Sequence, residues 1–105
     1  MKGKVLCINT KDSGMVIVAL KEGGKIIKSL SEENKYGSQV LLPLIVKLLK
    51  VNNQDFQDLE GIEVEEGPGS FTGLKVGASV AQALGFALNI PVNGSVGKQL
   101  KLQYT

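Results

Sequence analysis

The chain has 105 residues and a net charge of +2, and its twelve basic residues are all lysine. This length holds one domain with one hydrophobic core, which we place at residues 1–105. The small charge excludes binding to nucleic acid through broad phosphate neutralisation. Lysine also lacks the planar fork with which arginine recognises phosphate or guanine. We therefore expect no direct contact with nucleic acid.

Histidine is absent and Cys7 is the single cysteine, which fits a reducing compartment. The usual zinc sites and the Cys-His or Ser-His pairs of nucleophilic enzymes are therefore excluded. Residues 76–97 carry no charge. However, polar residues, proline and glycine interrupt this run, and only 76–88 looks helical, which is short of the roughly 20 residues of a membrane span. We expect a soluble, cytoplasmic protein without a membrane span.

Three apolar runs open the chain and predict three strands, at Val5–Ile8, Met15–Leu20 and Lys25–Leu30. The segments Lys11–Gly14 and Lys21–Gly24 between them are typical of turns, and the second predicts a hairpin. After a polar break, a helix is predicted near 38–51, then a strand at Gly61–Glu66, a helix near 71–88 and a short strand near Ile90–Val92. The order β-β-β-α-β-α-β predicts an α/β fold with an antiparallel meander followed by parallel crossovers.

Both predicted helices are more apolar than one buried face requires. All but three residues from Val40 to Val51 are aliphatic, and small residues recur every four positions in the second helix. A helix that lies on a sheet needs an apolar stripe only a little wider than about 100°. Two interpretations stay open: close packing on the chain's own sheet, or a helix-to-helix interface with a partner. For the interface we select Leu41, Leu44, Ile45, Leu48, Gly73, Gly77, Ala81 and Gly85.

The most specific motif is Gly-Pro-Gly-Ser-Phe-Thr-Gly-Leu-Lys-Val-Gly at residues 67–77. Its opening residues are Gly67, Pro68, Gly69, Ser70, Phe71, Thr72 and Gly73. The glycines around the proline allow a sharp turn, and Ser70 or Thr72 can cap the helix that follows. The motif is either a strand-to-helix connection or a phosphate-binding loop, and spacing alone does not separate the two.

This motif resembles the hallmark of the TsaB (YeaZ) family, which works in tRNA threonylcarbamoyladenosine biosynthesis. Lys4–Thr10, residues 38–45, Phe56–Ile62 and Asn89–Val92 resemble further family segments in the same order, so the resemblance covers about 4–94. It implies one ribonuclease-H-like half of the actin and sugar-kinase ATPase superfamily, whose complete members have two halves. Residues 95–105 form a divergent tail without this resemblance.

The resemblance implies a non-catalytic scaffold in tRNA modification, which binds and activates a TsaD-like transferase through the two helices. It also implies a homodimer in isolation and a TsaE-like ATPase as a further partner, and it implies no cofactor. An alternative is a minimal nucleotide-binding protein of the actin-like ATPase fold. A third is a self-associating short homologue without modification activity.

Two groups of residues are candidates for chemistry. The superfamily's ATPases carry an acid at the end of the first strand, where this chain has Asn9; a nucleotide would have to use the turn of Asn9, Thr10, Ser13 and Gly14. The acids Glu63 and Glu65 alternate with apolar residues and are candidate metal ligands. The alternative for these glutamates is a solvated sheet face. We expect neither ATP hydrolysis nor the peptide cleavage that older glycoprotease labels suggest.

Overall fold

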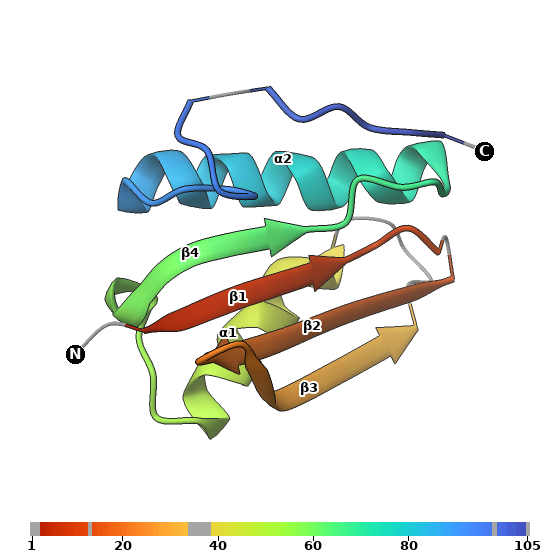
Figure 1. The fold of residues 1–105 in the computed structure, drawn as a ribbon. Coiled ribbons are helices and arrows are strands. Elements are labelled where there is room, and N and C mark those ends of the chain that lie inside the picture. The colour runs from red at the N-terminus through yellow and green to blue at the C-terminus, as the bar shows by residue number, and fades with distance from the viewer. Residues whose placement is uncertain (1–2, 13, 34–38, 98, 105) are drawn as a thin grey trace.

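The structure is a computed structural model that describes residues 3–12, 14–33, 39–97 and 99–104. Four strands, two α-helices and one 3₁₀ turn form two layers (Figure 1). In chain order the elements are β1 (Lys4–Asn9), β2 (Met15–Glu22), β3 (Lys25–Glu33), α1 (Leu41–Val51), η2 (Phe56–Asp58), β4 (Leu59–Val64) and α2 (Phe71–Leu88).

The strands form one mixed sheet in the order β3-β2-β1-β4. β2 is antiparallel to β1 and β3, and β4 joins β1 in parallel. Leu6 of β1 pairs with Leu20 of β2 and with Ile62 of β4, and Ile8 is the next residue of β1 on the same side. Because side chains alternate along a strand, these residues share one face of the sheet. This face of the sheet forms one side of the hydrophobic core.

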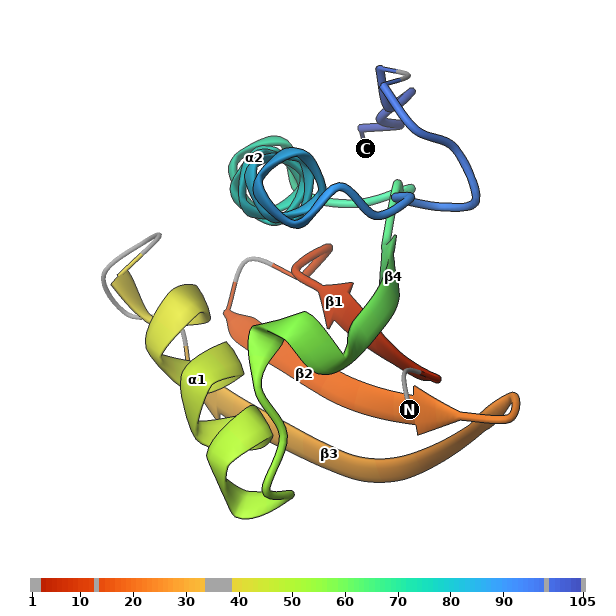
Figure 2. The ribbon, with the colours of Figure 1, turned by 90° about the vertical axis from the view of Figure 1, so that its left-hand side faces the viewer.

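Both helices cover that same face (Figure 2). α1 packs on β2 and β3, whereas α2 packs on β4 and β1. The core combines Leu6, Ile8 and Val18 of the sheet with α1 residues such as Ile45 and Leu48. The other face of the sheet carries no helix within the described residues, and we call it the open face. The predicted α/β fold, with a meander followed by a parallel crossover, is confirmed.

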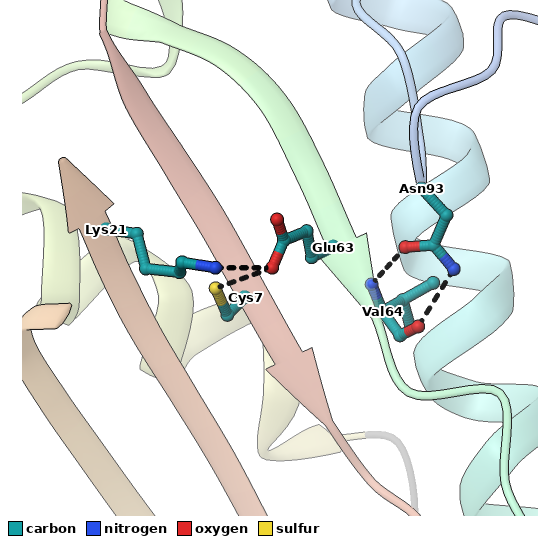
Figure 3. Close-up of polar contacts among 5 residues, drawn as sticks. All are labelled: Cys7, Lys21, Glu63, Val64 and Asn93. Carbon is teal, nitrogen blue, oxygen red and sulfur yellow. Dashed lines mark hydrogen bonds and ion pairs between the residues drawn. The ribbon is translucent and has the colours of Figure 1, made fainter. Parts of the chain in front are cut away.

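The short strand predicted near Ile90–Val92 does not form in the structure. Val92 makes isolated bridges, parallel to Ile62 and antiparallel to Ser95, and Pro91 has no N–H to donate to a ladder. The side chain of Asn93 replaces the missing strand pairing: it accepts from the Val64 N–H at 2.8 Å and donates to the Val64 carbonyl at 3.0 Å (Figure 3). A side-chain amide can pair with a strand edge in this way because it carries one donor and one acceptor group.

The start of the first helix also differs from the prediction. α1 begins at Leu41 and has Pro43 in its first turn, where a missing N–H breaks no helical hydrogen bond. Ser38, at the predicted start, lies outside the described residues.

α2 spans Phe71–Leu88, which confirms the predicted helix near 71–88, and within the uncharged run 76–97 only 76–88 is helical. By length and composition α2 could cross a membrane. Its buried residues nevertheless face the sheet, which is the packing of a core helix.

Candidate functional site

The motif loop connects β4 to α2 and lies against the end of β1. Ser70 caps α2, since its Oγ accepts a hydrogen bond from the Gly73 N–H at 3.3 Å. Gly67 has φ +111°, a conformation that favours glycine. A Cβ at Gly69 would lie 2.7 Å from the Lys11 carbonyl oxygen. The glycines of the motif are therefore needed where the loop backbone meets Gln103 of the tail and Lys11, which follows β1.

Several backbone N–H groups of the loop form hydrogen bonds within the chain. The Ser70 N–H donates to the Lys11 carbonyl at 2.8 Å, and the Gly69 N–H donates to the Gln103 carbonyl at 3.1 Å. A phosphate-binding loop needs free N–H groups and a positive field. Here the glutamates at 65–66 come directly before the loop and would repel an anion. This geometry favours the strand-to-helix connection over the phosphate-binding interpretation.

The glycines of α2 allow the helix to lie very close to β1. A Cβ at Gly73 would collide with the Thr10 carbonyl oxygen, and one at Gly77 would collide with the Thr10 hydroxyl. That hydroxyl is buried and donates to the Gly73 carbonyl at 2.6 Å. Near the other end of the helix, a Cβ at Gly85 would lie 2.5 Å from the Val92 side chain. The stripe of small residues therefore serves packing on the chain's own sheet.

The eight residues predicted to contact a partner are all buried. Four lie on α1 and four on α2: Leu41, Leu44, Ile45, Leu48, Gly73, Gly77, Ala81 and Gly85. The prediction that these particular side chains form an external interface is wrong. α1 turns its largest apolar stripe toward the sheet, and α2 turns its smallest residues toward the sheet. These arrangements remove the most apolar surface from water.

Large hydrophobic side chains remain exposed on other sides of the two helices. On α1 these are Leu42, at 46% exposure, and Val51, at 54%. On α2 they are Phe71, at 58%, and Phe86, at 91%. We call these four residues the outer helical residues. Single exposed apolar side chains are ordinary, but several on two neighbouring helices indicate a contact surface.

Of the four residues considered for nucleotide binding, the three that the structure describes do not form a pocket of free donors. Thr10 is 1% exposed, and its hydroxyl is already bonded to α2. Asn9 accepts a hydrogen bond from the Lys11 N–H at 3.2 Å, which closes a local turn. Gly14 is exposed, and Ser13 lies outside the described residues.

The two acids considered as metal ligands are engaged in other contacts. Glu63 forms an ion pair with Lys21 at 2.9 Å, and Glu65 accepts from the Gly67 N–H at 3.4 Å. Both carboxylates line an open concavity of about 740 Å³ on the open face. Among the described residues there is no group of three side chains that could hold a metal ion. Ca²⁺ takes six to eight oxygen ligands, so the pair by itself is a poor site.

Cys7 lies half-buried on the open face of the sheet. Its Sγ is 3.8 Å from the Glu63 carboxylate, which also contacts Lys21 (Figure 3). Burial, and secondarily the charge of Glu63, raise the pKa of the Cys7 thiol from 9.0 to about 11. Because the thiolate is the nucleophile, this environment disfavours covalent chemistry at Cys7.

This pKa predicts slow alkylation of Cys7. At pH 8 a thiol of pKa about 11 holds roughly a hundredfold less thiolate than one of pKa 9.0, so iodoacetamide should react about a hundredfold more slowly with the folded chain than with the urea-unfolded chain. Glu63→Gln should lower the pKa and speed the reaction, while Lys21→Met should slow it. Equal rates for the three folded chains would contradict this account.

The divergent tail lies along the motif loop, a contact that the sequence did not predict. The Gln103 N–H donates to the Glu66 carbonyl at 2.7 Å, and Tyr104 forms a parallel bridge with Gly69. The ring of Tyr104 packs on Phe71, with centroids 4.7 Å apart. No pattern within the tail signals this pairing, because the partner residues are distant in the sequence.

Residues 31–94 match the sequence model of a family described as "TsaD: tRNA N6-adenosine threonylcarbamoyltransferase". The chain is 34% identical over 95 residues to the tRNA threonylcarbamoyladenosine biosynthesis protein TsaB of Buchnera aphidicola subsp. Schizaphis graminum, covering 90% of this chain and 44% of the relative.

A shorter match of 54 residues, at 50% identity, reaches the tRNA N6-adenosine threonylcarbamoyltransferase of Nitrosospira multiformis and covers 51% of this chain and 16% of that enzyme. Among solved structures, YeaZ from Pseudomonas aeruginosa superposes with a TM-score of 0.77 at 32% identity, covering 85% of this chain and 42% of that one. The chain spans less than half the length of these TsaB and YeaZ relatives. By sequence and by fold, it belongs to the family of the matched model and, within it, to the TsaB (YeaZ) proteins.

Proposed function

We propose that this chain is a non-catalytic scaffold in the biosynthesis of tRNA threonylcarbamoyladenosine, and that it binds and activates a TsaD-like transferase. The observation that carries the proposal is the set of outer helical residues on α1 and α2. Membership of the TsaB family supports the pathway, because relatives carry that biosynthetic name. The contact is proposed for the outer sides of the helices, not for the buried residues first selected.

The chemistry of the side chains present supports a scaffold over an enzyme. The sequence has no histidine to act as a general base. The raised pKa of Cys7 keeps its thiol protonated near neutral pH. The buried Thr10 hydroxyl is bonded to the Gly73 carbonyl and has no route to a substrate.

The partner is proposed to be a paralogue of the same fold. The short match to a threonylcarbamoyltransferase supports this choice, because related domains can offer one another matching helical surfaces. In isolation the chain is proposed to pair with itself through the same helices and to exchange that partner for the transferase. A TsaE-like ATPase would dock on the resulting pair.

Light scattering coupled to size exclusion tests the scaffold role. The chain is run alone and then mixed with the transferase paralogue from the same source. A complex of defined stoichiometry is expected, and a chain that ignores the transferase at tens of micromolar would overturn the proposal. Calorimetry with Mg-ATP addresses the nucleotide-binding alternative, which micromolar binding would favour.

Phe86→Ser is expected to weaken transferase binding about thirtyfold, because exposed aromatic side chains are frequent anchors of interfaces and contribute about 2 kcal/mol when removed. Phe86 is 91% exposed, so this change should leave the stability of the isolated chain nearly unaltered. The matched control is Ile26→Ser, an exposed hydrophobic residue on β3. Calorimetric titration of both variants measures the effect, and equal affinities for the two would exclude Phe86 from the interface.

A further inference from the structure

β3 is one of the two edge strands of the described sheet, and among the described strands it pairs only with β2. It is nine residues long, and every residue except Leu30 is exposed. A strand in this position presents a row of backbone N–H and C=O groups that no neighbour satisfies. Such an edge can accept another strand through main-chain hydrogen bonds.

The charges of β3 are separated by sign along the strand. Lys25 and Lys28 stand before Ser29 in its middle, and Glu32 lies beyond it. Neither Lys28 nor Glu32 forms an ion pair or a hydrogen bond within the described chain. In contrast, Lys4 of β1 pairs with Glu22 on the neighbouring β2, and Lys21 of β2 reaches across β1 to Glu63 of β4.

From this pattern we propose that β3 pairs with β3 of a second copy of this chain. The two strands run antiparallel about a two-fold axis at Ser29, which joins two four-stranded sheets into one continuous sheet of eight. This surface is separate from the proposed transferase contact, which uses the outer sides of the helices. The inference therefore goes beyond the scaffold function and does not depend on it.

The proposed register brings opposite charges together twice. Lys28 and Glu32 lie on the same face of β3, because they pair with Leu20 and Val16 of β2, which share one face. With Ser29 opposite its own copy, Lys28 of each chain lies diagonally across from Glu32 of the other, which gives two opposite-charge contacts against one like-charge contact between the two Lys28 side chains. Long side chains reach such diagonal neighbours. A parallel arrangement would instead place like charges side by side, which is unfavourable.

The competing explanation is that β3 is an edge strand protected against pairing with another chain, and some of the same features are expected of such a strand. Lysine on an edge strand and a bulge both discourage pairing, and β3 has a bulge where it meets Leu20 and Lys21. Charged residues protect an edge strand best when they all have the same sign, because two copies of the strand then repel each other along their whole length. Here the two signs occupy opposite halves, so the charges of two antiparallel copies attract. The sign pattern therefore favours pairing in this one orientation.

Sedimentation equilibrium of the full chain tests the proposal with two charge-reversal variants. Lys28→Glu and Glu32→Lys should each raise the dissociation constant of the dimer about tenfold, because each variant places like charges at both diagonal contacts between residues 28 and 32. An equimolar mixture of the two variants should associate as tightly as the parent, since each diagonal contact then joins opposite charges. Circular dichroism checks that both variants remain folded.

Phe86→Ser is the control for self-association through the helices, and it should leave the β3 dimer unchanged. Three results would overturn the proposal. The first is a parent chain that stays monomeric at millimolar concentration, which would indicate edge protection. The second is a mixture that associates no better than the single variants. The third is self-association lost in Phe86→Ser but kept in both charge variants, which would assign it to the helices.

Discussion

Gly77→Leu is expected to destabilise the isolated chain by about 3 kcal/mol or more. A Cβ at this position would collide with the Thr10 hydroxyl and lie 3.5 Å from Ile8 Cγ2, so a leucine has no space between α2 and β1. The helix would have to move away, which would also break the hydrogen bond from Thr10 to the Gly73 carbonyl.

The sign of this change in stability follows from the sizes of its favourable and unfavourable contributions. Leucine in place of glycine gains up to about 1 kcal/mol of helix propensity. Overpacking costs about 1–3 kcal/mol, and the buried Thr10 hydroxyl left without a partner adds about 1–3 kcal/mol. The losses exceed the gain, so the change is destabilising. Urea unfolding followed by circular dichroism measures it.

Ala83→Leu is the matched control for Gly77→Leu. Ala83 is exposed on the same helix, so the same side chain meets no neighbour there and stability should change little. If Gly77 instead served only an external partner, Gly77→Leu would leave the isolated chain as stable as Ala83→Leu. Equal unfolding midpoints for the two variants would therefore contradict the packing found at Gly77.

Leu48→Ala is expected to cost 2–5 kcal/mol, the usual range for removing a fully buried leucine side chain. Leu48 has 0% exposure at the centre of the face that α1 turns to the sheet. Domains of this size have about 5–15 kcal/mol of stability, so the change removes a large share of it. Its expected effect on thermal unfolding is a decrease in Tm of roughly 15 °C.

Leu42→Ala provides the comparison for Leu48→Ala within one helix. Leu42 is 46% exposed, so the same truncation should cost less than about 1 kcal/mol. Differential scanning calorimetry of the two variants measures the contrast. A larger loss for Leu42 than for Leu48 would mean that α1 is rotated relative to the arrangement described.

The first three strands were predictable because their signals are local. The glycine pair after Glu22 predicts a tight hairpin, and both Gly23 and Gly24 adopt positive φ, at 59° and 80°. The strands nevertheless extend past the apolar runs: β3 reaches Glu33, because its pairing with β2 continues there. Hydrophobicity marks the buried part of a strand, whereas hydrogen bonding sets its ends.

The candidate site was predicted less completely. A cap at Ser70 or Thr72 was predicted from their place before a helix, and in the structure Ser70 is the cap. The paired roles of Thr10 and Gly73 were not foreseen, since the two residues are far apart in the sequence and meet only when α2 docks on β1. The strand-like pairing of Asn93 with Val64 was missed for the same reason.

The sequence by itself determined the order of strands and helices, the turn-and-cap form of the motif, and the resemblance to the TsaB family. These features depend on residues close together in the chain, where turn preferences, alternation and capping act directly. Only the tertiary structure decided which side of each helix is buried. Since α1 and α2 are apolar on nearly every side, hydrophobicity could not distinguish the buried residues from the exposed ones. For α2, the close contact of Gly73 and Gly77 with Thr10 determines which side faces the sheet.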